Sequence, residues 1–390
     1  MLASTVRVTR DLDLAEEAVQ DAYVQALAAW AADGVPARPG AWLTVAARRN
    51  ALNVLQRQRT LESKLPLLIV PDSPVESDIP DDRLRLVFTC CHPALAVEAQ
   101  VALTLRMVCG MATAEVAGVL LVSEPTMAAR ITRAKKKIAL ARIPYVVPSA
   151  ADLPDRVEAA LMVIHLLYSA GHTATAGPDL MRDDLAERAL DLARMLRLLL
   201  PGEPEVAGLL ALLLIHHARR SSRADADGRL VRLDEQDRSG WDRAMIAEAD
   251  RLITAALTAA APGRFTLQAA IAALHAEAAT YGETDWAQIV LLYDQLLRIW
   301  PSPVVALNRA AAVSRADGPA AALALVEELE RDGRLAAYHY LPATKADLLR
   351  RLDRHDEAAT AYAEALALAG NAAEQRFLEA RVDEMRRPTR

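Results

Sequence analysis

The sequence has few aromatic residues and few glycines. Phe, Trp and Tyr make up 4% of its 390 residues and glycine occurs 15 times, whereas 53% of the residues are hydrophobic, with heavy use of Ala and Leu. Ala and Leu are among the strongest helix formers, and glycine is among the weakest. The composition therefore predicts an all-α protein.

Cysteines and long apolar runs are also scarce. Three cysteines, Cys90, Cys91 and Cys109, are too few for the disulfide framework of a small secreted protein. The N-terminus shows no secretory signal, and the longest apolar stretch, residues 206–215, is far shorter than the roughly 20 residues that cross a bilayer. We expect a cytoplasmic protein with no membrane segment.

The chain is too long for one hydrophobic core, because single cores stop growing near roughly 250–300 residues. Residues 65–81 carry four prolines among Asp and Ser, and three further prolines interrupt the helical pattern after residue 143 (Pro144, Pro148 and Pro154). These breaks predict a linker at 65–81 between helical units at 1–64 and 82–143, followed by a large helical domain at 154–390.

The net charge of −6 hides two basic segments. Residues 48–64 contain five cations and one acid, Glu62, and residues 123–142 contain six cations and one acid, Glu124. Nucleic-acid binding depends on where cations cluster rather than on the total charge. Both segments are therefore candidate DNA-binding surfaces.

The first unit contains two amphipathic patterns. In residues 11–30, the side expected to face the core is Ala15, Ala18, Val19, Ala22, Tyr23, Ala26, Leu27 and Trp30. In the next helix, "AWLTVAARRNALNVLQRQR", a polar stripe has helical spacing and comprises Arg49, Asn53, Gln56 and Arg57. This stripe could follow phosphates and read bases, and an ordinary solvated face would look the same.

The second unit has the pattern of a helix-turn-helix. "EAQVALTLRMVCG" predicts a helix closed by Gly110, "TAEVAGVLL" a second short helix, and Ser123 the N-cap of a third, "SEPTMAARITRAKKKIALAR". The third helix should bury Met127, Ile131, Ala134 and Ile138 and present Thr126, Ala129, Arg130 and Arg133 outward. Such a helix enters the major groove N-terminus first, although an amphipathic helix with a solvated basic face would show the same spacing.

These motifs resemble those of bacterial RNA polymerase sigma factors of the extracytoplasmic-function type, in the group with a C-terminal tetratricopeptide-like extension. "DLAEEAVQDAYVQAL" followed by "PGAWLTVAARRNALNVLQRQRT" is similar to region two of that family. "DDRLRLVFTCCHPALAVEAQVALTLRMVCGMATAEVAGVLLVSEPTMAARITRAKKKI" is similar to region four. The resemblance implies an alternative sigma factor that binds core RNA polymerase and recognises the −10 and −35 promoter elements.

The resemblance assigns expected roles to individual positions. Polymerase binding is expected at Asp13, Gln20 and Asp21, and contact with the −10 element at Arg48, Arg49, Asn53, Gln56 and Arg57. The −35 element is expected to contact Thr126, Ala129, Arg130, Arg133, Lys135, Lys136 and Lys137, the three lysines near phosphate. Residues 32–40 should hold a base flipped from the −10 element, and region two is expected to be N-terminally short.

The C-terminal half shows a degenerate repeat. Tyr293, Val326 and Tyr362 recur at spacings of 33 and 36 residues, and Ala358 and Ala365 flank Tyr362 as in a tetratricopeptide second helix. We expect such repeats at about 285–385, with a concave surface for a protein or peptide ligand, or else a plain α bundle. The resemblance implies that this domain modulates the sigma factor.

Other readings compete with this one. A helix-turn-helix regulator acting without polymerase, or a tetratricopeptide scaffold, would share part of the pattern. We do not expect enzymatic activity, and we expect neither a bound metal nor a cofactor. Neighbouring residues such as His216 and His217, or Cys90 and Cys91 in "FTCCHP", project about 100° apart on a helix and do not converge on one ion. The cysteine pair therefore predicts core packing, with a thiol sensor as the alternative.

Overall fold

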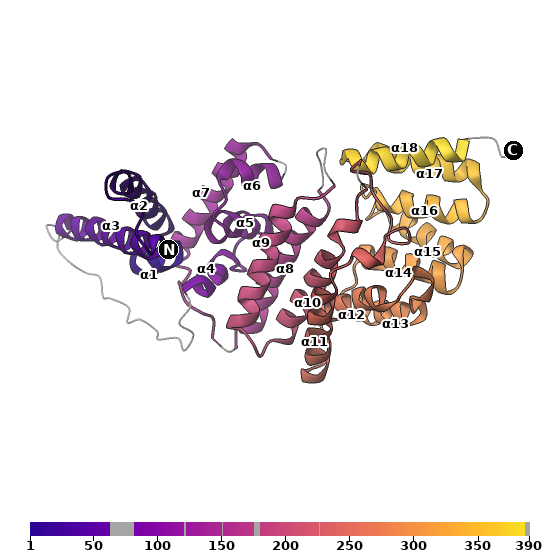
Figure 1. The fold of residues 1–390 in the computed structure, drawn as a ribbon, viewed down its shortest axis with the longest axis horizontal. Helices are drawn as coiled ribbons and strands as arrows, with labels where there is room; N and C mark the ends of the chain where they lie inside the picture. The colour runs from indigo at the N-terminus through magenta and orange to yellow at the C-terminus, as the bar shows by residue number, and fades with distance from the viewer. Residues whose placement is uncertain (63–81, 121, 150, 175–179, 226, 387–390) are drawn as a thin grey trace. The chain divides into compact units, whose positions relative to one another are not determined.

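The computed structural model describes residues 1–62, 82–120, 122–149, 151–174, 180–225 and 227–386, so the expected linker at 65–81 lies outside the described residues. Within these ranges the chain is helical and contains no strand, only an isolated bridge between Ala224 and Leu230. The all-α prediction is therefore confirmed. The helices form two compact units, Met1–Val163 and Ile164–Arg390 (Figure 1). Their division falls inside α8 (Leu153–His172), whereas the sequence suggested that the last domain begins at residue 154.

The first part of the N-terminal unit consists of α1 (Leu2–Thr9), α2 (Leu12–Asp33) and α3 (Pro39–Glu62). The Asp11 carboxylate caps α2 by accepting from the backbone nitrogens of Asp13 and Leu14, at 2.8 and 3.0 Å. Helices α2 and α3 pack along a seam of small, buried side chains: Ala15, Ala18, Ala22, Ala26, Ala47 and Ala51. Small residues let the two backbones approach closely.

The second part of this unit comprises α4 (Asp82–Cys90), α5 (Val97–Leu103), α6 (Thr113–Val119) and α7 (Glu124–Leu140). The helix predicted to end at Gly110 is present, but after α5 it winds into a π-helical turn, Thr104–Val108. Gly110 then has a φ of 71°, the left-handed conformation that glycine adopts most readily. The remaining elements form the expected short helix, turn and third helix.

The C-terminal unit begins with the end of α8 and continues with α9 (Asp183–Leu199), α10 (Pro204–Ala218), α11 (Arg243–Ala259) and α12 (Arg264–Glu277). Helix α10 is buried on nearly every side and packs against α9, α11 and α12. Its Gly208 allows a close approach, because a Cβ there would lie 2.5 Å from Thr266 Oγ1. Single 3₁₀ turns, Arg220–Ser222, Arg238–Gly240 and Tyr281–Glu283, lie in the connections.

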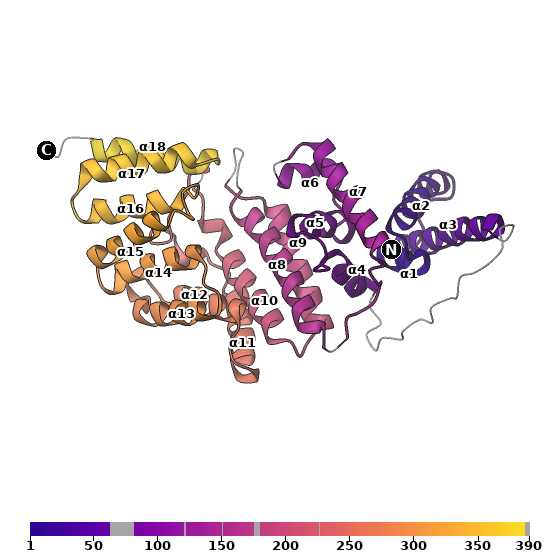
Figure 2. The same ribbon diagram turned by 180° about the vertical axis from the view of Figure 1, so that it is seen from behind.

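The rest of this unit is a row of helix hairpins. Helices α13 (Trp286–Ile299), α14 (Pro303–Ala316), α15 (Pro319–Asp332), α16 (Tyr340–Arg351), α17 (His355–Leu368) and α18 (Ala372–Arg386) each pack on the next in sequence (Figure 2).

The hairpins have the period expected from the sequence. Helices α13, α15 and α17 start at residues 286, 319 and 355, which are 33 and 36 residues apart. Val326, Ala358, Tyr362 and Ala365 are all buried in the shared core of this row. No helix within the described ranges combines the length and hydropathy of a membrane-crossing segment.

Candidate functional site

Helix α7 has one buried face and one exposed face. Ser123 caps it, with Oγ accepting from the Thr126 backbone nitrogen at 3.4 Å, and Pro125 occupies the first turn. The predicted core residues Met127, Ile131, Ala134 and Ile138 are all buried. The opposite face carries Thr126, Ala129 and Arg133, which are exposed, and Arg130, which is partly exposed. The first turns of α7 therefore present the surface that a recognition helix needs.

The three lysines of α7 differ in their surroundings. Lys136 and Lys137 are exposed, and the Lys137 ammonium also donates to the Ala94 carbonyl. The Lys135 side chain is only 10% exposed, because its Nζ lies 2.7 Å from Asp13 Oδ1 and 2.7 Å from Glu16 Oε2 on α2. Burial lowers the pKa of Lys135. The hydrogen bonds and charges of the two carboxylates together raise it by more, so the net shift is upward. In this conformation Lys135 cannot contact a phosphate.

Glu16 connects the two parts of the N-terminal unit. Besides accepting from Lys135, it forms an ion pair with Arg106 in the π-helical turn. A second link joins α1 to α4, since the Tyr145 hydroxyl lies 2.8 Å from the Ala3 carbonyl and 2.7 Å from that of Asp82. We call the ion-paired set Asp13, Glu16, Arg106 and Lys135 the α2–α7 network. In this network Asp13, which was expected to bind polymerase, forms an ion pair with Lys135, which was expected to contact DNA.

The remaining polymerase-facing candidates lie on the open side of α2. Gln20 and Asp21 are exposed, as is most of the Asp13 carboxylate. Tyr23 and Leu27 were expected in the core but are 51% and 76% exposed, and Val24 between them is 65% exposed. The prediction was wrong there because α3 covers only the alanine seam. These apolar side chains extend the candidate surface and were missed by periodicity alone.

The candidates for the −10 element lie along α3. Arg48, Arg49, Asn53 and Gln56 are all exposed, whereas the side chain of Arg57 lies outside the described residues. Asn50 is turned away from them, because its side chain bonds to Gln25 and to the Ala18 carbonyl on α2. The connection from α2 to α3 is short and exposed, and next to it Trp30 and Trp42 meet edge to face at 5.6 Å.

In the "FTCCHP" stretch, residues 88–91 are buried, whereas His92 is partly exposed and Pro93 is exposed. Helix α4 ends at Cys90, and both Cys90 and Cys91 are fully buried. Burial raises the pKa of both thiols, that of Cys91 to about 11, although Thr104 Oγ1 lies 3.5 Å from its sulfur. Buried thiols with raised pKa values are poor nucleophiles. The core-packing prediction is confirmed. Among the residues that the structure describes, no three His, Cys, Asp or Glu side chains could hold a metal ion.

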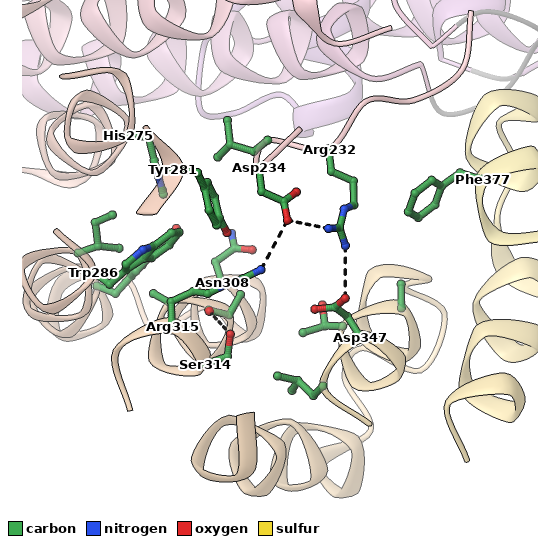
Figure 3. A pocket seen from close by; sticks show the side chains of 18 of the residues that line it. Arg232, Asp234, His275, Tyr281, Trp286, Asn308, Ser314, Arg315, Asp347 and Phe377 are labelled. Atoms are coloured by element: carbon green, nitrogen blue, oxygen red, sulfur yellow. Dashed lines mark hydrogen bonds and ion pairs between the residues drawn. The ribbon is translucent and has the colours of Figure 1, made fainter. Parts of the chain in front are cut away.

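The C-terminal unit contains a cavity of about 390 Å³ (Figure 3). One side is formed by α13, α14 and α16, and the other by the connection that carries Arg232 and Asp234. Arg232 bonds to Asp234 at 2.6 Å and to Asp347 at 3.4 Å, while Arg315 lies 3.8 Å from Asp234 and stacks over Tyr281. The charges at this wall therefore neutralise one another.

The cavity lining also includes an amide side chain and several aromatic side chains. Asn308 is exposed and lies between Tyr281 and Arg315 (Figure 3), and its amide forms no hydrogen bond within the described part of the chain. Aromatic side chains complete the lining: Tyr281, Trp286, Tyr293, Tyr362 and Phe377. Aromatic walls with a few polar groups are typical of ligand pockets.

Comparisons with known proteins agree with the geometry of the N-terminal unit. Residues 2–60 match region 2 and residues 85–138 match region 4 of the sigma-70 family, and residues 156–257 match a family of unknown function, DUF6596. An uncharacterized protein of Rhizobium meliloti (strain 1021) is 43% identical over 394 residues, which cover 98% of this chain and 93% of that protein. The chain belongs to the sigma-70 family and is an alternative sigma factor of the extracytoplasmic-function kind, which binds RNA polymerase and recognises promoter elements.

Proposed function

We propose that the exposed residues of α2, α3 and α7 divide the work of this sigma factor. Asp13, Gln20 and Asp21 would bind core polymerase, and the exposed cations and amides of α3 would contact the −10 element. The observation that carries the proposal is the α7 surface: Thr126, Ala129, Arg130 and Arg133 face away from a buried stripe at the start of a capped helix. Since polymerase works in the cytoplasm, so would this protein.

Run-off transcription with purified core polymerase tests this proposal. The full chain should direct initiation from its own promoter, and a variant with Arg130→Ala and Arg133→Ala should lose it while still binding core. Tight binding of duplex promoter DNA without polymerase, together with failure to initiate, would instead favour a helix-turn-helix regulator.

We further propose that the C-terminal unit modulates this activity by binding a protein or peptide in the cavity of Figure 3. The Asn308 amide can both donate to and accept from a peptide backbone, and the aromatic walls suit side chains. The ion pairs of Arg232 and Arg315 hold the cavity open without leaving an uncompensated charge. The repeat assignment of the helix hairpins is part of this proposal.

A peptide library panned against the full chain tests the ligand. Selected peptides should bind the parent protein and lose about tenfold in affinity for Asn308→Ala, about the value of one or two hydrogen bonds. Glu328→Gln on α15, outside the cavity lining, serves as the control. Peptides that bind both variants equally would place the ligand elsewhere.

A further inference from the structure

Histidines gather in the C-terminal unit. Five of the eight in the chain lie on three helices that pack together: His165 and His172 on α8, His216 and His217 on α10, and His275 on α12. The rings of His172 and His216 are 5.1 Å apart, and that of Tyr168 is stacked 5.5 Å from His172. None of these histidines belongs to the surfaces proposed for polymerase binding or promoter recognition.

A cavity of about 200 Å³ lies between these side chains. Its lining includes His165, Tyr168, His172, Thr173, His216 and Tyr340. It differs from the larger cavity of Figure 3, which has none of these residues in its wall. With Ser169, which also belongs to the lining, three imidazoles and four hydroxyl-bearing side chains surround one small space.

Two arginines stand behind this lining. Arg223 is only 7% exposed and donates to the His172 carbonyl and, at 3.0 Å, to Thr173 Oγ1. Arg219 Nη2 lies 3.4 Å from His216 Nδ1. Within the described residues, neither guanidinium lies within 4.0 Å of a carboxylate. Glu374, the nearest acid at the Tyr340 wall, accepts from the Tyr340 hydroxyl and lies 3.4 Å from His339.

These contacts orient hydrogen-bond donors. A guanidinium has no acceptor, so His216 Nδ1 must accept from Arg219, and the proton of this imidazole is on Nε2. Thr173 Oγ1 accepts from Arg223 in the same way, which leaves its own hydrogen to donate. Burial and the neighbouring arginines lower the pKa of His172 and of His216, so both rings are neutral near pH 7. The cavity therefore offers neutral donors backed by two fixed positive charges.

We infer that this cavity binds a small oxyanion, a phosphate or a carboxylate group of a metabolite, held by His216 and Thr173 and attracted by Arg219 and Arg223. A buried cation without a partner carboxylate is costly, and a bound anion removes that cost. The cavity is smaller than the roughly 300–1,000 Å³ of drug-sized sites, which suits a small ligand. The oxyanion site is independent of the proposed peptide site and of promoter recognition.

Titration calorimetry on the full chain tests the site with inorganic phosphate and citrate as probes, against sodium chloride at equal ionic strength. Saturable binding of phosphate supports a phosphate ligand, and saturable binding of citrate alone supports a carboxylate. His216→Phe keeps a ring but loses the donor, and should weaken binding about 10- to 100-fold, as expected for a charge-assisted hydrogen bond.

Arg219 acts through His216, so its test needs a second readout. Arg219→Met should weaken oxyanion binding to a similar extent while leaving the thermal midpoint of the ligand-free protein unchanged or higher, because an unpaired buried charge has been removed. Arg220→Met, one residue further along, is the matched control and should bind as the parent does, because Arg220 donates to the His217 carbonyl and makes no bond to His216.

Three results would overturn the inference. The first is no saturable binding of either probe beyond the chloride control. The second is binding that survives both His216→Phe and Arg219→Met, which would place the anion elsewhere. The third is a lower midpoint for ligand-free Arg219→Met with unchanged affinity, which would make Arg219 a structural residue. If Arg219→Met does not fold, the His216→Phe result decides alone.

Discussion

The cations of α7 and those at the end of α10 are held in opposite ways. Arg133, Lys136 and Lys137 stand in solvent, where charge costs little and salt screens it, as suits contact with a polyanion that comes and goes. Arg219 and Arg223 lie among protein atoms with carbonyl, hydroxyl and imidazole partners. In the proposed roles, the exposed cations contact DNA without a cost in folding stability, whereas the buried arginines lower the stability of the protein until an anion binds.

The largest expected effect is that acid destabilises the C-terminal unit, which contains the buried histidines and arginines. Burial, followed by nearby arginines, lowers the pKa of His165 and of His275 to about 4. Their folded values lie below the unfolded value of about 6.5, so the unfolded chain takes up protons first, and stability falls as the pH drops from 6.5 toward 4. Each histidine contributes roughly 1.4 kcal/mol per pH unit, or together about 4 kcal/mol at pH 5.

Hydrogen exchange of the full chain at pH 7.5, 6.5 and 5 measures this effect in both units. Protection should be lost in Ile164–Arg390 before Met1–Val163, whose only histidine is His92. Equal loss in both units would show that the buried histidines do not set the acid limit.

Removing cations from the exposed face of α7 should reduce transcription without changing the stability of the fold. Arg130→Ala combined with Arg133→Ala should reduce −35-dependent transcription about 100-fold, because a good contact to a base or phosphate contributes about 1–3 kcal/mol. Run-off assays measure the loss, and an unchanged thermal midpoint distinguishes it from unfolding. Arg251→Ala, an exposed arginine on α11, should be silent.

Lys135 lies between the two extremes, since it is largely buried but fully paired. Glu16→Gln removes the carboxylate shared by Lys135 and Arg106 and should weaken the α2–α7 network by about 1–3 kcal/mol. Fluorescence anisotropy with promoter duplex should then show tighter binding without polymerase, because Lys135 keeps only the Asp13 carboxylate as a partner and its positive charge is less neutralised. Glu17→Gln, the exposed neighbour, is the control. Weaker DNA binding by Glu16→Gln would mean that the network supports the recognition helix instead of occupying it.

The smallest expected effect concerns the placement of the exposed face. Ser123→Ala removes the N-cap of α7 and should cost about 1 kcal/mol of stability. Denaturant unfolding measures this loss, with Ser239→Ala outside α7 for comparison. A change in DNA binding much larger than this would show that the cap also orients the recognition helix on DNA.

Local periodicity explains which parts of the structure could be predicted. The buried stripe of α7 and its N-cap depend on residues a few positions apart, and both appear as expected. The pairing of Lys135 with Asp13 joins residues 122 positions apart, and no local pattern encodes it. The prediction that Tyr23 and Leu27 are buried was wrong, because periodicity identifies an apolar face but not how much of that face the neighbouring helix covers.

The histidine cluster had a partial signal in the sequence. His165, Tyr168 and His172 are spaced three and four residues apart, which places them on one face of α8. His216 lines one cavity with this face and a second cavity with His275, and this depends on how α10 and α12 pack, which the sequence pattern does not reveal. The pattern also gives no sign of the arginines that lie beside these histidines.

The alanine seam between α2 and α3 has a geometric consequence. Alanine has no rotamers to order, so a seam of six buried alanines joins the two helices with little side-chain freedom. Gln20 and Asp21 on one helix and Arg48 and Arg49 on the other are therefore carried by a single rigid body. The seam therefore fixes the distance between the surface proposed to bind polymerase and the surface proposed to contact the −10 element before either partner binds.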